Sequence, residues 1–416
     1  MSRSLVETVF PVRLGRSFRW LMASSWLTNL GDGINIAAGP LLVASETRDP
    51  RLVALAATML YLPPVLFGLV AGVLADRLDR RLLTVVSNLC RIGVLATLTL
   101  VLVTGRVDIV WVLLTIFALG VAETFADTTT STLLPMLVAK RDLGIANARL
   151  MGGIITLNQL AGPPLGALLF AAGRSWPFLT QVVCLVLSVL MILRLELPPH
   201  GAEDAPGTRS VRADMAQGLR WVWHHAAVRT LVLTILVFNV TFGAAWSVMV
   251  LYSLDRLHMG AVGFGLLTSA MALGGIAGTT SYGWLEQHVS LADIMRGGLV
   301  IETLTHLALA VNTLPWVALV VFFVFGAHAF VWGTTSSTVR QRAVPTQMQG
   351  RVRGVYSLGL TGGIVVGSVL GGAIAGRWGV VAPFWFAFVG SAVFLVLIWP
   401  QLTHIAHADE EIVAAD

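Results

Sequence analysis

The chain has 416 residues, of which 56% are hydrophobic and 12% are charged, and its mean hydropathy is +0.81. Soluble domains carry roughly 25% charged residues, so this composition excludes a soluble protein and predicts a membrane protein with several spans. The formal net charge of +5 comes from arginine, because Lys140 is the sole lysine. We interpret the positive charge as arginine in the loops beside a membrane, and we expect no nucleic-acid partner.

Twelve apolar runs follow one another along the chain, and each is close to the roughly 20 residues that a helix needs to cross a bilayer. They predict an all-α membrane protein with twelve transmembrane helices. The runs lie at about residues 20–44, 52–75, 82–104, 109–134, 143–172, 176–195, 229–254, 262–285, 291–311, 315–339, 354–376 and 380–402.

Basic residues are distributed unevenly between the two sets of loops. The N-terminal segment and the loops after even-numbered spans hold 20 of the 27 basic residues, the other loops hold six, and Arg91 lies inside a span. Because basic residues concentrate in cytoplasmic loops, this bias predicts that both termini lie in the cytoplasm. We expect a multi-pass protein of the bacterial cytoplasmic (inner) membrane.

The longest loop divides the chain near its middle. It begins with Pro198-Pro199 and then becomes amphipathic, with Val211, Met215 and Leu219 recurring at helical spacing. This pattern is typical of a helix at the membrane surface. We expect an N-terminal six-helix bundle at 1–195, a cytoplasmic linker with an amphipathic helix at 196–228, and a C-terminal six-helix bundle with an acidic tail at 229–416.

An internal repeat supports two related bundles. Asn29 and Gly33 recur 210 residues later as Asn239 and Gly243. Gly162 and Gly166 recur 205 residues later. A third set recurs 206 residues later and consists of Gly120, Thr128, Thr129, Ser131 and Thr132. Half the chain is 208 residues long, so the repeat predicts two pseudo-symmetric six-helix halves with a site at their interface and alternating access around it.

A charged turn separates the second and third spans, with the sequence Gly72-Val-Leu-Ala-Asp76-Arg77-Leu-Asp79-Arg80-Arg81. It resembles the loop between helices 2 and 3 of the major facilitator superfamily of transporters, and Asp79 followed by two arginines resembles the branch of enterobactin exporters and macrolide efflux proteins. The resemblance implies that Gly72, Asp76, Arg77, Arg80 and Arg81 gate the inter-bundle opening. The arginines would also anchor the topology, and the two roles are compatible.

The fifth span contains Gly162, Pro163 and Gly166 and resembles the glycine-proline motif of the superfamily's antiporters. It departs from that motif at Asn158 and Ala167, where glycine is usual. The residues predict a kinked helix that packs closely against a neighbour, and the resemblance favours export over import.

Acidic residues inside spans are candidate functional groups because charge in a bilayer is costly. Asp32 lies in the first span, and its counterpart in the repeat is Phe242, so the repeat does not require an acid there. We interpret Asp32 as a proton-coupling or substrate-binding residue. The alternative is a carboxyl group that only joins neighbouring helices.

Glu123 and Asp127 are four residues apart in the fourth span and therefore share one helix face. Two carboxylates this close in an apolar environment do not both ionise readily, so the pair is a candidate site for a proton or a cationic substrate group. The alternative is an ion pair with Arg91 of the third span. The resemblance implies an arginine in helix 4, where this chain has Ile116, and Arg91 is a candidate to take its role.

The ninth and tenth spans contain further polar candidates. Glu302 and His306 are four residues apart, and we interpret them as a structural pair. His328, in the tenth span, is a candidate for the proton-coupling or substrate site. Six aromatic residues lie on spans that, by the resemblance, line the cavity: Trp26, Phe238, Phe242, Trp246, Phe330 and Trp332. Such side chains suit an amphipathic or cationic organic molecule. The alternative is that they only pack against neighbouring helices.

Together these features predict a secondary active transporter, a proton-coupled exporter of an amphipathic drug or natural product such as a macrolide or siderophore. The alternatives are an importer or facilitator of a small solute and a non-transporting membrane sensor or scaffold. The sequence contains no HExxH, GxSxG or phosphate-loop motif, so we expect no enzyme, no metal and no cofactor, with the proton gradient as the energy source. The expected partners are the lipid bilayer and a small organic substrate, and we expect a monomer.

Overall fold

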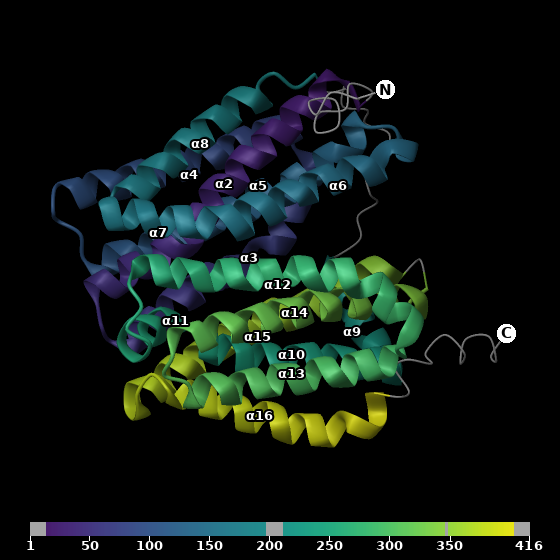
Figure 1. The fold of residues 1–416 in the computed structure, drawn as a ribbon. Coiled ribbons are helices and arrows are strands. Elements are labelled where there is room, and N and C mark those ends of the chain that lie inside the picture. Colours follow the sequence, from purple (N-terminus) through teal and green to yellow (C-terminus); the bar gives the residue numbers. More distant parts are fainter. Residues whose placement is uncertain (1–13, 197–210, 346–347, 403–416) are drawn as a thin grey trace, which may run out of the picture. The chain divides into compact units, whose positions relative to one another are not determined.

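The computed structural model describes residues 14–196, 211–345 and 348–402, and these residues form helices and connecting turns without any strand. Figure 1 labels the α-helices along the chain. The elements are α2 (Gly15–Glu46), α3 (Pro50–Arg77), α4 (Arg80–Val103), α5 (Ile109–Leu137), η2 (Lys140–Asp142), α6 (Leu143–Gly153), η3 (Ile154–Ala161), α7 (Gly162–Ala172), α8 (Trp176–Ile192), α9 (Val211–His224), α10 (Ala226–Trp246), α11 (Met249–Leu251), η5 (Tyr252–Arg256), α12 (Ala261–His288), α13 (Leu291–Val311), α14 (Pro315–Ala343), α15 (Gln349–Trp378), α16 (Ala382–Ile398) and η7 (Trp399–Gln401).

The twelve predicted spans correspond to helices in the described part of the chain. Ten of them are long and apolar enough to cross a membrane, with α6, η3 and α7 counted as one continuous span. The other two are α8, which is apolar but has 17 residues, and α2, which has 32 residues and carries Asn29 and Asp32 in its interior. The prediction of an all-α, multi-pass membrane protein is therefore confirmed.

The chain divides into two compact units. One takes the described residues of Met1–Glu46 and Leu62–Gly207, and the other takes those of Thr47–Tyr61 and Thr208–Asp416. Residues 50–61 of α3 thus belong to the second unit, whereas residues 62–77 of the same helix belong to the first. The domain boundaries at residues 195 and 229 remain a prediction.

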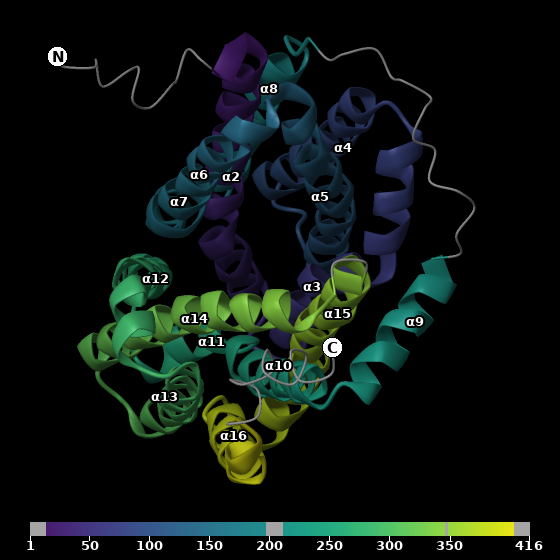
Figure 2. The same ribbon diagram turned by 90° about the vertical axis from the view of Figure 1, so that its right-hand side faces the viewer.

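In the first unit, α2 packs against α7 and α8, and α4 packs against α5 and α8 (Figure 2). The contact between α2 and the fifth span is close enough that a Cβ on Gly33 would lie 2.5 Å from the Asn158 carbonyl oxygen. A Cβ on Gly162 would lie 2.6 Å from the backbone of Gly33. Glycine is required at this crossing because the two backbones touch.

The fifth span changes its helical form at the proline pair. Residues Ile154–Ala161 form a π-helix, and the α-helix resumes at Gly162. Pro163 and Pro164 supply no backbone N–H, so they cannot donate to carbonyls in the preceding turn, and the wider π turn accommodates the lost hydrogen bonds. The predicted distortion is therefore present as a π segment that seats the span against α2.

The second unit repeats this crossing between α10 and α15. A Cβ on Gly243 would lie 2.6 Å from the Ile364 carbonyl oxygen, and one on Gly363 would lie 2.8 Å from the Leu236 carbonyl oxygen. The unit also contains close α12–α14, α13–α14 and α13–α16 contacts, and these helices run side by side in Figure 1. The glycine repeat seen in the sequence therefore marks the same helix contact in both units.

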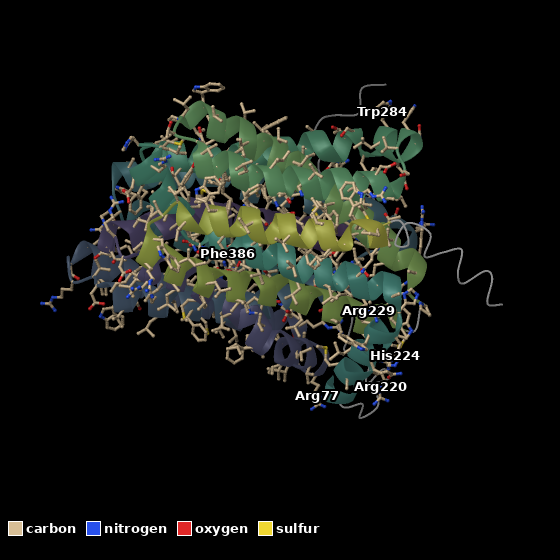
Figure 3. The ribbon with its side chains drawn as sticks, turned by 90° about the horizontal axis from the view of Figure 1, so that it is seen from below. Arg77, Arg220, His224, Arg229, Trp284 and Phe386 are labelled. Atoms are coloured by element: carbon tan, nitrogen blue, oxygen red, sulfur yellow. The ribbon has the colours of Figure 1, made fainter. Side chains whose placement is uncertain are left out.

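The helix predicted in the linker is α9, which packs on α10 and α15. Its Val222 belongs to the apolar core of the second unit, whereas Leu219 and Trp223 are exposed. Arg229, at the start of α10, donates a 3.0 Å hydrogen bond to the Trp223 carbonyl oxygen. Figure 3 shows Arg220, His224 and Arg229 gathered at one end of this unit, the end at which Trp284 of α12 also lies.

Candidate functional site

A buried ion pair joins α2 to α4 inside the first unit. The Arg91 guanidinium donates to the Asp32 carboxylate, and the two side chains are 2% and 16% exposed. Gln181 of α8 donates a second hydrogen bond, 3.1 Å long, to the same oxygen of Asp32. Side chains from α4 and α8 thus converge on one carboxylate of α2, and the guanidinium of Arg91 balances its charge.

Glu123 and Asp127 occupy the neighbouring helix α5, and Asp127 is more exposed than Asp32. Glu123 is half-buried and Asp127 is exposed, and both interact electrostatically with Arg91 and Asp32. The sequence offered Arg91 as their ion-pair partner, but the structure pairs Arg91 with Asp32. A carboxylate facing lipid is costly, so the accessible side of Asp127 is best explained by contact with water or a ligand.

The predicted gating motif forms the turn between α3 and α4. Asp79 caps α4 by accepting a 3.0 Å hydrogen bond from the Leu82 backbone N–H. Arg80 donates a 3.1 Å hydrogen bond to the Ala75 carbonyl oxygen in the last turns of α3, and Arg81 donates to the Leu193 carbonyl oxygen at the end of α8. Both guanidinium groups thus reach carbonyl oxygens at the C-terminal ends of other helices, α3 and α8, where positive charge is stabilising.

The remaining motif residues are placed less tightly. Gly72 lies within α3 with open space around it, and Arg77 is exposed at the end of that helix. The side chain of Asp76 lies outside the described residues.

In the second unit, Glu302 of α13 contacts His328 of α14, with 3.3 Å between the carboxylate oxygen and Nε2. The pairing of Glu302 with His306 expected from their spacing is therefore wrong. The reason is the close packing of α13 on α14, where a Cβ on Gly298 would lie 2.8 Å from His328 Nδ1. His306 is 2% exposed, and neither of its ring nitrogens has a hydrogen-bond partner among the described residues.

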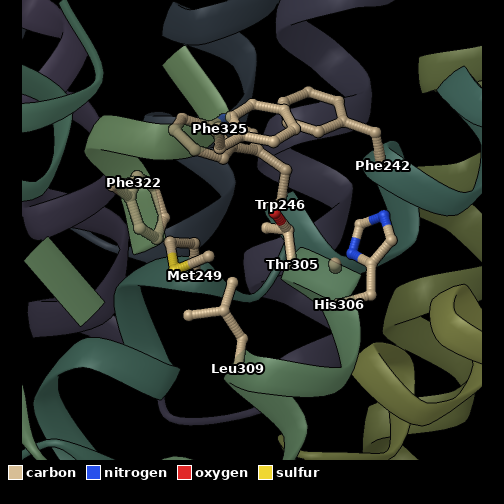
Figure 4. A pocket seen from close by; sticks show the side chains of 9 residues that line it. Phe242, Trp246, Met249, Thr305, His306, Leu309, Phe322 and Phe325 are labelled. Atoms are coloured by element: carbon tan, nitrogen blue, oxygen red, sulfur yellow. The ribbon is translucent and has the colours of Figure 1, made fainter. Parts of the chain in front are cut away.

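The six predicted cavity aromatics have different surroundings. Phe242 and Trp246 line a small cavity of about 20 Å³ inside the second unit (Figure 4). Phe238 and Trp332 lie in the apolar core of that unit. The other two pack at helix crossings of their own units, Trp26 against Gly153 and Phe330 against Gly275.

Two polar contacts in the structure were not predicted from the sequence. Gln181 was not predicted to be a site residue, although a buried amide in the apolar helix α8 indicates a polar partner. The sequence also did not predict the ion pair at 3.0 Å between Arg48 and Asp255, which joins the segment before α3 to the rest of the second unit. Within the described parts of the chain, no three His, Cys, Asp or Glu side chains are grouped so that they could hold a metal ion.

Solved transporters share this fold. A bacterial homolog of the human lysosomal transporter Spinster, in an inward-facing and unoccupied conformation, superposes with a TM-score of 0.68 at 13% identity, covering 99% of both chains. A bacterial homologue of the iron transporter ferroportin, in an inward-facing state, gives a TM-score of 0.69 at 16% identity, covering 92% of this chain and 99% of that one. At these identities the likeness establishes the fold alone.

Two similar proteins are named as an efflux pump and an exporter. The multidrug efflux pump Tap of Mycolicibacterium fortuitum is 29% identical over 373 residues, which are 85% of this chain and 88% of Tap. The enterobactin exporter EntS of Escherichia coli O9:H4 is 26% identical over 420 residues, 96% of each chain. Residues 7–414 match the family described as transmembrane secretion effectors. The chain therefore belongs to the transmembrane secretion effectors of the major facilitator superfamily, as the charged turn between the second and third spans suggested.

Proposed function

We propose that this protein is a proton-coupled exporter of an amphipathic drug or natural product, working by alternating access in the bacterial inner membrane with both termini in the cytoplasm. In this proposal Glu123 and Asp127 carry the exchangeable proton, while the Arg91–Asp32 ion pair stays fixed. The efflux activities of Tap and EntS support the direction of transport.

The observation that carries the proposal is the charge imbalance in the first unit. Three carboxyl groups (Asp32, Glu123 and Asp127) interact with the single guanidinium of Arg91. The charge of Asp32 is balanced by Arg91, and Gln181 donates a further hydrogen bond to it, which leaves two carboxyl groups one helical turn apart. In a low-dielectric bundle such a pair holds a proton or a cation instead of two negative charges.

This arrangement couples two events through one site. A cationic group of a substrate that reaches Glu123 and Asp127 replaces the proton, and the returning proton releases the substrate. The exposed Asp127 suits this exchange because both ligands must reach the pair, whereas Asp32 is held by Arg91 and Gln181.

The test is accumulation of fluorescent amphipathic compounds, ethidium among them, in inverted membrane vesicles with an acidic lumen. We expect wild-type protein to accumulate at least one compound only while the gradient lasts. The Glu123→Gln/Asp127→Asn variant should lose gradient-driven accumulation at least ten-fold but keep downhill equilibration. Glu286→Gln is the matched control, because this carboxyl group is 40% exposed at the end of α12.

Two results would contradict the proposal. Full gradient-driven accumulation by the Glu123→Gln/Asp127→Asn variant would remove this pair from the coupling path. Uptake in the opposite direction, or no movement of any compound by wild-type protein, would favour the importer or the non-transporting scaffold.

A further inference from the structure

Helix α9 presents two faces of different character. On one face, Val222 belongs to the apolar core of the second unit, and a Cβ on Gly218 would lie 3.0 Å from the Arg351 carbonyl oxygen of α15. The other face carries Leu219 and Trp223, which are one turn apart and are 57% and 61% exposed. Large apolar side chains on the exposed face of an amphipathic helix are typical of a helix that lies in the membrane interface.

Basic side chains border this apolar pair. Arg220 and His224 directly follow Leu219 and Trp223 in the sequence, and both are exposed. The Nδ1 atom of His224 donates a 2.7 Å hydrogen bond to the Arg220 carbonyl oxygen, which holds the ring on the helix. The guanidinium of Arg229, from the start of α10, lies 5.9 Å from the centroid of the Trp223 ring. These residues form one surface, which we call the α9 face: Leu219, Arg220, Trp223, His224 and Arg229.

The positive charge of the α9 face is not balanced by an ion pair among the described residues. The described side chains of α9, at residues 215–224, include no acid. Glu286 of α12 is already engaged with Arg342, at 3.6 Å. The guanidinium of Arg220 has no hydrogen-bond or ion-pair partner within the described parts of the chain. Arg220 is therefore available to a partner that carries negative charge.

A second exposed tryptophan lies at the same end of the unit. Trp284 of α12 is 60% exposed and stacks on His288 with 4.7 Å between the ring centroids. Figure 3 shows it at the end where Arg220, His224 and Arg229 gather. Tryptophan is enriched at the level of the lipid headgroups, so this end of the unit lies where the phosphate groups of the lipids are.

We propose that the α9 face binds an anionic phospholipid, with Leu219 and Trp223 against the upper acyl chains and Arg220 on the phosphodiester group, beside Arg229. Arginine suits this group because its planar guanidinium donates two parallel hydrogen bonds to a phosphate. A zwitterionic lipid carries its own cation, which opposes the arginines, so the face favours a headgroup with net negative charge. The inference does not depend on the direction of transport, and it stands or falls separately from the carboxyl pair of the first unit.

The experiment offers delipidated full-length protein in detergent equal amounts of phosphatidylglycerol and phosphatidylcholine with the same acyl chains, and native mass spectrometry counts the lipid that each protein molecule retains. We expect wild-type protein to retain phosphatidylglycerol at least five-fold more. Arg220→Gln should lower this preference about five-fold, which corresponds to the roughly 1 kcal/mol that one arginine contributes near an anionic surface. Arg220→Lys keeps the charge and should keep the preference within about two-fold. Arg106→Gln is the matched control, because this arginine is also exposed but lies in the first unit, and it should change nothing.

A further variant tests another occupant of the α9 face. Residues 403–416 contain four acids and follow Leu402, which shares the apolar core of the second unit with Val222. A variant that ends at Leu402 should show the wild-type preference. The proposal is overturned if the preference appears only in this shortened variant, because the acidic tail and not a lipid would then occupy the face. It is also overturned if wild-type protein retains the two lipids equally, or if Arg220→Gln keeps the full preference.

Discussion

Replacement of Arg91 by methionine should expose the energetic role of the ion pair in the first unit. Methionine keeps an unbranched chain but removes the guanidinium, so Asp32 retains the single hydrogen bond from Gln181. Removing one partner of a buried ion pair costs about 3–5 kcal/mol, because the other charge stays buried without compensation. Since the Asp32 side chain is 16% exposed, we expect the lower end, about 3 kcal/mol.

The decisive comparison adds Asp32→Asn to Arg91→Met. The double variant contains no buried charge at this position, and the carbonyl oxygen of the introduced amide can still accept from Gln181, so its free energy of unfolding should return to within about 1.5 kcal/mol of wild type. The assay is reversible unfolding in mixed micelles by titration with a denaturing detergent. Arg106→Met is the control, because this arginine is exposed and its loss should change stability by at most about 0.5 kcal/mol.

A strictly additive result would refute the reasoning. If the double variant loses the sum of the two single losses, Arg91 and Asp32 stabilise the unit independently and the ion pair is not the feature that holds α2 to α4. Equal stability of Arg91→Met and wild type would have the same meaning.

Two other predictions concern helix contacts and can be checked by the same unfolding assay. Gly33→Ala should cost about 1–3 kcal/mol of unfolding free energy, because its Cβ would lie 2.5 Å from the Asn158 carbonyl oxygen. Gly68 has open space around it, so Gly68→Ala should be neutral or slightly stabilising. Equal losses in the two variants would contradict the close crossing. Asp79→Ala should cost about 1 kcal/mol of unfolding free energy, because it removes the cap on the Leu82 N–H. Asp79→Ser restores a capping oxygen and should recover most of this loss. If serine does not recover the stability, the cap is not the cause of the loss.

The number and order of the spans could be predicted because hydrophobicity alone sets them. A run of about 20 apolar residues has one stable form in a bilayer, so each predicted run is a helix, including the polar α2. The form of the fifth span could be predicted only in part. Pro163 and Pro164 indicate a distortion, but whether it becomes a kink or the π segment Ile154–Ala161 depends on how α2 packs there.

The candidate site shows a different limit. Arg91 and Asp32 were each identified as buried charges, but their pairing joins residues 59 positions apart on two helices. Glu302 shows the same limit in the second unit, where an interhelical partner, His328, took the place of the intrahelical His306. Sequence spacing specifies neighbours on one helix, whereas the rotation of each helix against the next is set by the small residues at their contact.

The repeat explains why the two units hold different chemistry on the same scaffold. Gly33 and Gly243 occupy equivalent close crossings, and the residue before each is Asp32 in one unit and Phe242 in the other. The crossing holds both side chains in place, but Asp32 faces Arg91 while Phe242 forms part of the aromatic cavity. Both halves therefore keep the glycine contact, which the packing requires, while the adjacent position carries an ion-paired carboxylate in one half and a stacked aromatic ring in the other.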